Sequence, residues 1–305
     1  MEPLRQPLSL RILHFQATAQ VILTIAFILT LTGLTPVGSC AQPAPFPDFS
    51  KNIEYRLEPL SGGLQQVKEM FSNSQLMLLE KLNRCDLKHL VRHNSIVVPL
   101  SWYSNELMYS PLPQTYNWAK QCPKALVVHQ PAQCFGGYEY GRLVRWGPIS
   151  SGRRNRQTPD GFFHLNWRSR GKHSTVDPDW YMPWYFNFEN KLGLSLHQYS
   201  LPCQPASHAC IRLLERDAKW LYHWGEQWKL DSKGWNVLEP GTPLLIVGHY
   251  NFAESPPWRS IKWLAHGVEL PEDPTPGRKP CPAAAPSGSD ESRAADAGRQ
   301  EPVSR

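Results

Sequence analysis

The sequence predicts a mainly β fold with a helical N-terminal prefix and one helix after Cys210. Short apolar segments from about residue 124 onward are separated by glycine and proline turns, a spacing typical of β strands. Apolar residues in 64–82, and again after Cys210, recur instead at helical intervals. We therefore expect one mainly β domain at residues 120–250, with the helical prefix before it.

The charge of the chain limits the classes of partner. The 305 residues include 32 basic and 26 acidic side chains, which give a formal net charge of +6. This mild excess suits an anionic polymer but is too small and too scattered to indicate a nucleic-acid surface. The sequence also contains no phosphate-binding loop and no Cys-x-x-Cys pair. We expect neither a nucleic-acid partner nor a metal site.

Residues 1–40 have the pattern of a bacterial export signal. Two arginines precede an apolar stretch at 21–34 that is too short for a standard transmembrane helix. The stretch leads to Val37-Gly38-Ser39-Cys40, an imperfect lipobox, so we favour lipidation of Cys40 and attachment to a membrane. Cleavage after Ala41, which would release the protein, and an uncleaved anchor are the alternatives.

Residues 41–119 are expected to combine a proline-rich tether, a helical segment and an aromatic-rich stretch. The apolar spacing predicts the helix at 64–82. The aromatic side chains between Trp102 and Trp118 are candidates to line a groove for a glycan or a peptide, although most tryptophans pack in protein cores.

The C-terminal end is expected to contribute no second domain. Residues 251–270 are expected to form a C-terminal extension of the β domain. Residues 271–305 are rich in Pro, Ala, Ser and mixed charge, and no apolar periodicity runs through them, so we expect disorder there.

The strand pattern around His197 places its imidazole on an outward face. In residues 194–199 the leucines alternate with Ser195, His197 and Tyr199. Because alternate side chains leave a strand on opposite sides, these three are predicted to lie away from the core.

Cys210 is the candidate nucleophile. It follows Ser207-His208-Ala209 and precedes a helical pattern, so we expect a helix N-terminus to stabilise its thiolate. A thiol becomes a useful nucleophile when a base takes its proton and donors hold the oxyanion, which predicts acyl transfer with His197 as the base. The alternative is a small buried cysteine beside a satisfied strand histidine. The Ser-His-x-Cys-hydrophobic-Arg string favours the catalytic interpretation.

The string Ser207-His208-Ala209-Cys210-Ile211-Arg212 resembles the active-site signature of the YkuD-type L,D-transpeptidases, which usually reads Ser-His-Gly-Cys-hydrophobic-Arg/Asn. Other stretches resemble that domain in the same order along about 124–250. They are 141–144, 149–152, 158–163, 182–186 and 240–246. The resemblance implies a compact β sandwich or barrel with the catalytic loop on one rim.

The resemblance also implies a function, that of a peptidoglycan L,D-transpeptidase in the bacterial cell envelope. In this interpretation Cys210 attacks a tetrapeptide stem, His197 is the general base and acid, and D-alanine leaves before an amine acceptor takes the acyl group. The backbone at Ser207, His208 and Ala209 would form the loop and the oxyanion site. Arg212, Tyr199 and Met182 would contact substrate. The sulfur carries the acyl group, so no cofactor is expected.

Three questions stay open at this point. Water could replace the amine acceptor, which would give an L,D-carboxypeptidase or another peptidoglycan hydrolase. Ala209 stands where the family has glycine and would be strained if its φ is positive, so a non-catalytic wall-binding lipoprotein is a further alternative. Arg212 could bind a substrate carboxylate or form a salt bridge with Asp217 or Glu215.

The cysteines leave the disulfide pairing open. Cys85, Cys122, Cys134, Cys203 and Cys281 remain once Cys40 and Cys210 are assigned. Cys122 and Cys134 flank the first predicted strand of the β domain and are a candidate pair. A Cys203–Cys210 disulfide would switch the enzyme off and is the less favoured pairing.

Overall fold

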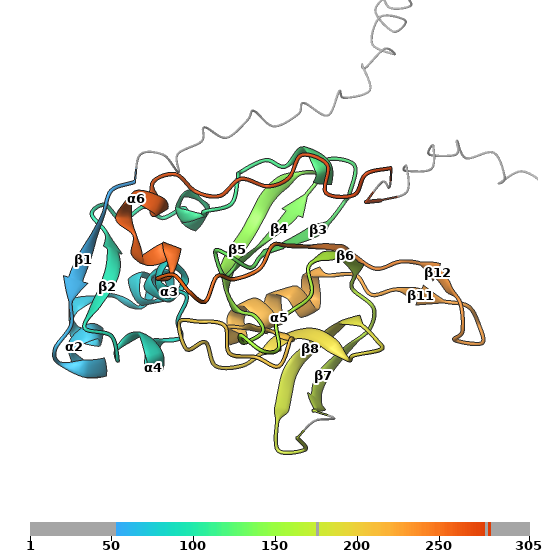
Figure 1. Cartoon of the computed structure of the whole chain (residues 1–305), viewed down its shortest axis with the longest axis horizontal. Helices are drawn as coiled ribbons and strands as arrows, with labels where there is room; N and C mark the ends of the chain where they lie inside the picture. The colour runs from blue at the N-terminus through green and yellow to red at the C-terminus, as the bar shows by residue number, and fades with distance from the viewer. Residues whose placement is uncertain (1–52, 175–176, 278–279, 282–305) are drawn as a thin grey trace, which may run out of the picture. The chain divides into compact units, whose positions relative to one another are not determined.

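The computed structural model describes residues 53–174, 177–277 and 280–281 (Figure 1). The predicted signal peptide, Cys40 and the proline-rich tether lie outside these residues. Within the described ranges, no helix combines the length and the hydrophobicity that a bilayer span requires.

A nine-stranded sheet organises the protein, and the mainly β prediction is confirmed. Its strand order is β6-β13-β3-β4-β5-β10-β9-β8-β7. Two neighbouring pairs are parallel, β13 with β3 and β10 with β9, and the other pairs are antiparallel. The strands are β3 (Ala125–His129), β4 (Cys134–Glu139), β5 (Arg142–Ser150), β6 (Gly161–His164), β7 (Arg168–His173), β8 (Tyr181–Glu189), β9 (Leu194–Gln198), β10 (Ile211–Leu213) and β13 (Pro243–Val247).

The helix expected directly after Cys210 begins later than predicted. Strand β10 follows Cys210 at once, and helix α5 (Glu215–Trp224) begins only at Glu215. Ile211 and Leu213 are both fully buried, so the apolar residues after the cysteine follow the strand period before the helical one. The expectation that a helix N-terminus stabilises the Cys210 thiolate is therefore wrong.

The N-terminal prefix contains strands that the sequence did not predict. Strands β1 (Tyr55–Pro59) and β2 (Ser95–Pro99) pair antiparallel, with three helices between them in the chain. The single helix expected at 64–82 is two helices, because Ser72 and Gln75 form a capping box that starts a new one. These helices are α2 (Gly63–Met70), α3 (Asn73–Asn83) and α4 (Leu87–Leu90).

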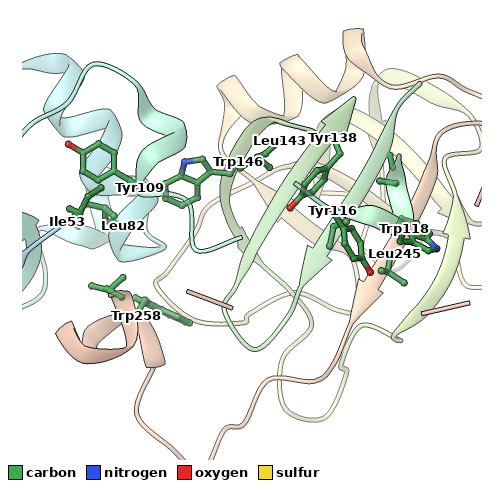
Figure 2. Close-up of a cluster of buried hydrophobic side chains, with 14 of the residues drawn as sticks. Ile53, Leu82, Tyr109, Tyr116, Trp118, Tyr138, Leu143, Trp146, Leu245 and Trp258 are labelled. Carbon is green, nitrogen blue, oxygen red and sulfur yellow. The ribbon is translucent and has the colours of Figure 1, made fainter. Parts of the chain in front are cut away.

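An aromatic cluster joins the prefix to the sheet (Figure 2). Trp146 of β5 and Trp258 are fully buried on the prefix side of the cluster. Tyr109, Tyr116 and Trp118 belong to the same cluster and are buried, so of the two roles offered for the aromatic-rich stretch, packing holds for them and the groove does not. They are core residues. The remaining short elements are η2 (Glu106–Tyr109), η3 (Asn117–Ala119), β11 (Lys229–Leu230), β12 (Val237–Glu239), η4 (Pro257–Arg259) and α6 (Ile261–Leu264).

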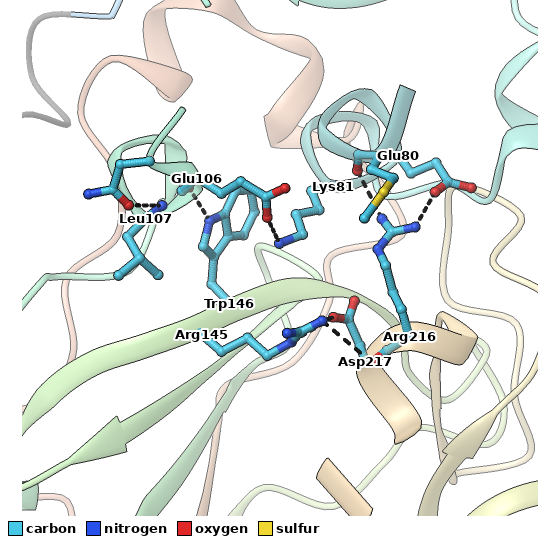
Figure 3. Close-up of polar contacts among 10 residues, drawn as sticks. Glu80, Lys81, Glu106, Leu107, Arg145, Trp146, Arg216 and Asp217 are labelled. Carbon is cyan, nitrogen blue, oxygen red and sulfur yellow. Dashed lines mark hydrogen bonds and ion pairs between the residues drawn. The ribbon is translucent and has the colours of Figure 1, made fainter. Parts of the chain in front are cut away.

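Ion pairs also hold helix α5 in place (Figure 3). Asp217 is fully buried and accepts hydrogen bonds from Nε and Nη2 of Arg145 at 2.9 and 2.7 Å. Arg216 pairs with Glu80 of the prefix. The salt bridge from Arg212 to Asp217 or Glu215 is absent among the described residues, because Asp217 is already paired with Arg145.

Two disulfides replace the pairing expected from the sequence. Cys122 is bonded to Cys281 and Cys85 to Cys203, while Cys134 is a buried free thiol. The candidate Cys122–Cys134 bond is therefore wrong, because Cys134 begins β4 whereas Cys122 lies just past the other end of that strand, where its carbonyl accepts from Tyr140 N–H. Cys203 is likewise unavailable to Cys210.

The chain from residue 271 is ordered for longer than expected. The Tyr116 hydroxyl donates to the Pro271 carbonyl at 2.6 Å, and Trp118 Nε1 donates to Thr275 Oγ1 at 3.1 Å. With the disulfide at Cys281, these bonds hold 271–277 and 280–281 against the sheet, so the predicted disorder is wrong for those residues. Residues 282–305 lie outside the described part.

Candidate active site

Strand pairing brings the two candidate catalytic residues to one place. Strands β9 and β10 are parallel neighbours, with Leu196 opposite Ile211 and His197 opposite Arg212. Leu196 and Ile211 are fully buried and face the core. One step back along both strands, Cys210 therefore comes beside Ser195, on the face that also carries His197.

This face opens into a cavity of about 330 Å³. The predicted residues Cys210, His197, Ser207, His208, Tyr199, Met182 and Arg212 all line it. Ala209 belongs to the same loop but is not among the lining residues. The other lining residues are Trp167, Lys172, Ser174, Trp180, Tyr185, Asn187, Asn190, Lys191, Leu192, Gly193 and Leu194.

The Cys210 sulfur has Ser195 as its hydrogen-bond donor. Ser195 Oγ donates to Cys210 Sγ at 3.5 Å, and Ser195 itself is fully buried. Burial raises the pKa of the Cys210 thiol, although the Ser195 hydroxyl, the Ser195 N–H and the Arg212 charge act in the opposite direction. At neutral pH the Cys210 side chain is therefore a thiol.

His197 is held as a neutral base. Its Nδ1 lies 3.0 Å from the carbonyl oxygen of Gln198, and because a carbonyl only accepts, Nδ1 carries the hydrogen. Nε2 is then left as the acceptor. Burial lowers the pKa of His197 to about 4, helped by the Arg212 charge and opposed by the Gln198 bond. Within the described residues no hydrogen bond joins His197 to Cys210. Hydrogen bonds between catalytic side chains are often long or missing before substrate binds, and they form in the complex.

The loop before the cysteine is fixed in an unusual conformation. Ala209 has φ 80°, in the left-handed region that favours glycine. The Ser207 hydroxyl donates to the Cys210 carbonyl and closes the loop. The His208 ring lies 4.7 Å from the Trp180 ring, and its buried Nδ1 has no hydrogen-bond partner in the structure. Burial and three nearby arginines lower the pKa of His208.

Arg212 lies in the cavity wall with an aromatic neighbour. Its guanidinium carbon is 4.6 Å from the centre of the Tyr199 ring, a cation–π contact. No acidic side chain among the described residues forms an ion pair with it. A guanidinium without a protein carboxylate is suited to bind the carboxylate of a ligand.

The sequence interpretation missed the far wall of the cavity. Lys172, Trp167 and Tyr185 come from or next to strands β7 and β8, whose pairing no local pattern revealed. Ser195 could have been found, because the alternation that exposed His197 places Ser195 on the same face.

One group of residues outside the cavity has metal-binding atoms close together. The donor atoms of Cys85, His93 and Cys203 lie within 4.8 Å of one another. The two sulfurs are joined in the disulfide, so they offer no thiolate to an ion. This group therefore fits a metal poorly in its oxidised form.

Comparison with known proteins supports the family resemblance of this segment. Residues 123–246 match the family model of the YkuD domain, described as the L,D-transpeptidase catalytic domain, which confirms the resemblance that the catalytic string predicted. All the cavity residues lie in this range. The comparison with curated proteins found no match.

Solved structures of L,D-transpeptidases also resemble the chain. One from Stackebrandtia nassauensis is 22% identical with a TM-score of 0.34, over 42% of this chain and 56% of that one. One from Mycobacterium smegmatis is 19% identical, with a TM-score of 0.33, over 41% and 58%. One from Mycobacterium tuberculosis H37Rv is 20% identical, with a TM-score of 0.32, over 41% and 57%. This chain spans little more than half the length of each.

Proposed function

We propose that this protein is a peptidoglycan L,D-transpeptidase that works through a cysteine acyl-enzyme in the bacterial cell envelope, attached to a membrane through Cys40. The observation that carries the proposal is the meeting of Cys210 and a neutral His197, from adjacent parallel strands, in one cavity. The match of residues 123–246 to the L,D-transpeptidase catalytic domain supports it.

In the first half-reaction the donor peptide is cleaved. Nε2 of His197 takes the proton of Cys210, and the thiolate attacks the carbonyl carbon of the residue before the terminal D-alanine. Backbone N–H groups in the loop at His208, Ala209 and Cys210 hold the oxyanion. When the tetrahedral intermediate collapses, the C–N bond breaks and His197 returns the proton to the departing D-alanine amine. A thioester on Cys210 remains.

In the second half-reaction the thioester is resolved. His197 takes a proton from the acceptor amine, which attacks the thioester carbonyl, and the sulfur leaves. The same base could activate water, and the product would then be a shortened stem. The acceptor decides between these outcomes, so product analysis separates them.

The test uses tetrapeptide muropeptides and the purified full chain, with products separated by mass. We expect cross-linked dimers and free D-alanine from the unaltered protein, and a loss of at least about 10³-fold in both Cys210→Ala and His197→Ala. Shortened monomers alone would identify a carboxypeptidase. Absence of any product or acyl-enzyme mass from the unaltered protein would favour a wall-binding lipoprotein.

A further inference from the structure

Lys172 is fixed in the active-site cavity by two aromatic rings. Its Nζ lies 5.0 Å from the centre of the Trp167 ring and 5.8 Å from that of Tyr185, and all three residues line the cavity. An ammonium over aromatic faces is attracted to them, so a side chain that is usually flexible is held at one place.

The charged side chains that line the cavity are all basic. Its lining includes Lys172, Lys191 and Arg212 but no aspartate or glutamate. Neither Lys172 nor Arg212 takes part in an ion pair with an acidic side chain of the described chain. Two positioned cations without protein counter-charges suit a ligand that brings its own negative groups.

The two cations are too far apart to serve one carboxylate. Lys172 is on β7 and Arg212 on β10, and the sheet order β10-β9-β8-β7 puts three strand spacings between them. At about 4.8 Å a spacing this is about 14 Å across the strands. Ser169, not Lys172, stands in the row of Arg212, which adds about 10 Å along the strands and brings the separation to about 17 Å. An extended peptide covers about 3.3 Å per residue, so the span corresponds to about five residues. The long side chains shorten it to two or three.

We propose that Lys172 binds a second carboxylate of the donor peptide, upstream of the bond that Cys210 attacks, while Arg212 binds the carboxylate nearest that bond. Lys172 is then a specificity-determining residue, and the substrate class is a short peptide with two free carboxylates. This inference rests on the proposed function and adds the chemistry that selects the donor.

The test measures binding without turnover. The full chain with Cys210→Ala is titrated by calorimetry with L-Ala-γ-D-Glu-L-Lys-D-Ala and with its counterpart in which the D-Glu α-carboxylate is a carboxamide. We expect the free acid to bind about tenfold more tightly than the amide. Adding Lys172→Met removes this difference, because it lowers the affinity for the free-acid peptide alone. Lys172→Arg keeps most of the difference.

Two lysines provide matched controls. Lys191 also lines the cavity but has no ring contact among the described residues. Lys219, on α5, lies outside the cavity, and its Nζ is 5.7 Å from the centre of the Trp184 ring. Lys191→Met and Lys219→Met change the net charge equally, and we expect both to leave the acid–amide difference within about twofold. An equal loss of affinity for both peptides in Lys172→Met would overturn the inference. So would equal affinity of the two peptides for the chain that retains Lys172, or no binding of the acid.

Kinetics distinguish this inference from the proposed function. With Cys210 present, Lys172→Met should raise KM for the free acid about tenfold and leave kcat within about twofold. If the acid–amide difference depends on Lys172 but no cross-linked product forms, the transpeptidase proposal fails while the binding site stands. If products form from both peptides with equal kcat/KM, only the role of Lys172 fails.

Discussion

Ser195 donates its hydroxyl hydrogen to the sulfur of Cys210 across the parallel pair β9–β10, at 3.5 Å. The serine is fully buried and lies two residues before His197 on the same strand face. The strand that carries His197, the proposed base, therefore also carries a hydrogen-bond donor to Cys210, the proposed nucleophile. The register of β9 against β10 therefore sets both the Ser195–Cys210 hydrogen bond and the face on which His197 lies.

Replacing Ser195 with alanine should make the nucleophile harder to ionise. A donor to the sulfur stabilises the thiolate, so its loss raises the pKa of Cys210 further. We expect Ser195→Ala to slow alkylation by iodoacetamide at pH 8 by about 3–10-fold and to move the rate profile to higher pH. Intact mass measures the rate. Ser169→Ala, whose hydroxyl bonds the Gly171 carbonyl, is the control, and identical profiles for all three proteins would contradict the prediction.

Acyl-enzyme formation should depend on pH through a neutral imidazole. His197 has its pKa lowered to about 4, and the pKa of Cys210 is raised, so the thiol and neutral base coexist over a broad range. We expect kcat/KM to fall only as pH drops toward about 4 and to form a plateau through neutral pH. A narrow bell-shaped pH profile of kcat/KM with its maximum between pH 6 and 7 would instead indicate a thiolate–imidazolium pair.

The same burial links folding stability to pH. His197 and His129 both have their pKa lowered by burial to about 4, so the unfolded chain binds more protons than the folded one between about pH 6.5 and 4. Their contribution is complete above about pH 6.5 and decreases as pH falls, by up to about 1.4 kcal/mol per pH unit for each histidine. Urea unfolding at pH 7 and pH 5 measures this. His129→Gln should reduce the difference, and an unchanged free energy of unfolding would refute it.

Glycine at position 209 should stabilise the catalytic loop. A residue with a Cβ costs roughly 1–2 kcal/mol at the positive φ of Ala209, partly offset by the greater freedom of glycine in the unfolded chain. We expect Ala209→Gly to raise the free energy of unfolding by about 0.5–1 kcal/mol, measured with urea. Ala218→Gly, in the interior of α5, should lower it by about 1 kcal/mol. A loss of stability in Ala209→Gly would contradict the strain argument.

Removing Arg145 should destabilise the protein strongly. Asp217 is fully buried, and its charge would be left without the two hydrogen bonds from Arg145. We expect Arg145→Met to lower the free energy of unfolding by about 3–5 kcal/mol. The double variant with Asp217→Leu should recover much of that loss, because no charge is then buried. A double variant as unstable as the single one would show that the arginine acts by packing instead.

The sequence predicted those site residues whose relationship is local. Ser207, His208 and Cys210 stand within four positions of a recognisable string, and the period of two around His197 sets the face of its imidazole. Lys172 could not be placed, because it reaches the cavity through the pairing of β7 with β8. The start of α5 was misplaced because Leu213 and Leu214 fit the helical spacing that continues through Ala218 and Leu221, although Ile211 and Leu213 follow the strand period. Disulfide partners 118 and 159 residues apart were equally beyond a sequence argument.

The Cys85–Cys203 bond has a consequence for how the protein can be divided. Cys203 lies between His197 and Cys210 in the chain, and its covalent partner belongs to the N-terminal prefix. The segment that matches the catalytic family begins only at residue 123, so excising it would leave an unpaired sulfur in the loop and would strip Trp146 of its cover. We therefore expect the excised fragment not to fold on its own. Grafting, shuffling or minimal-domain screening of this protein must therefore keep the prefix and the β domain together.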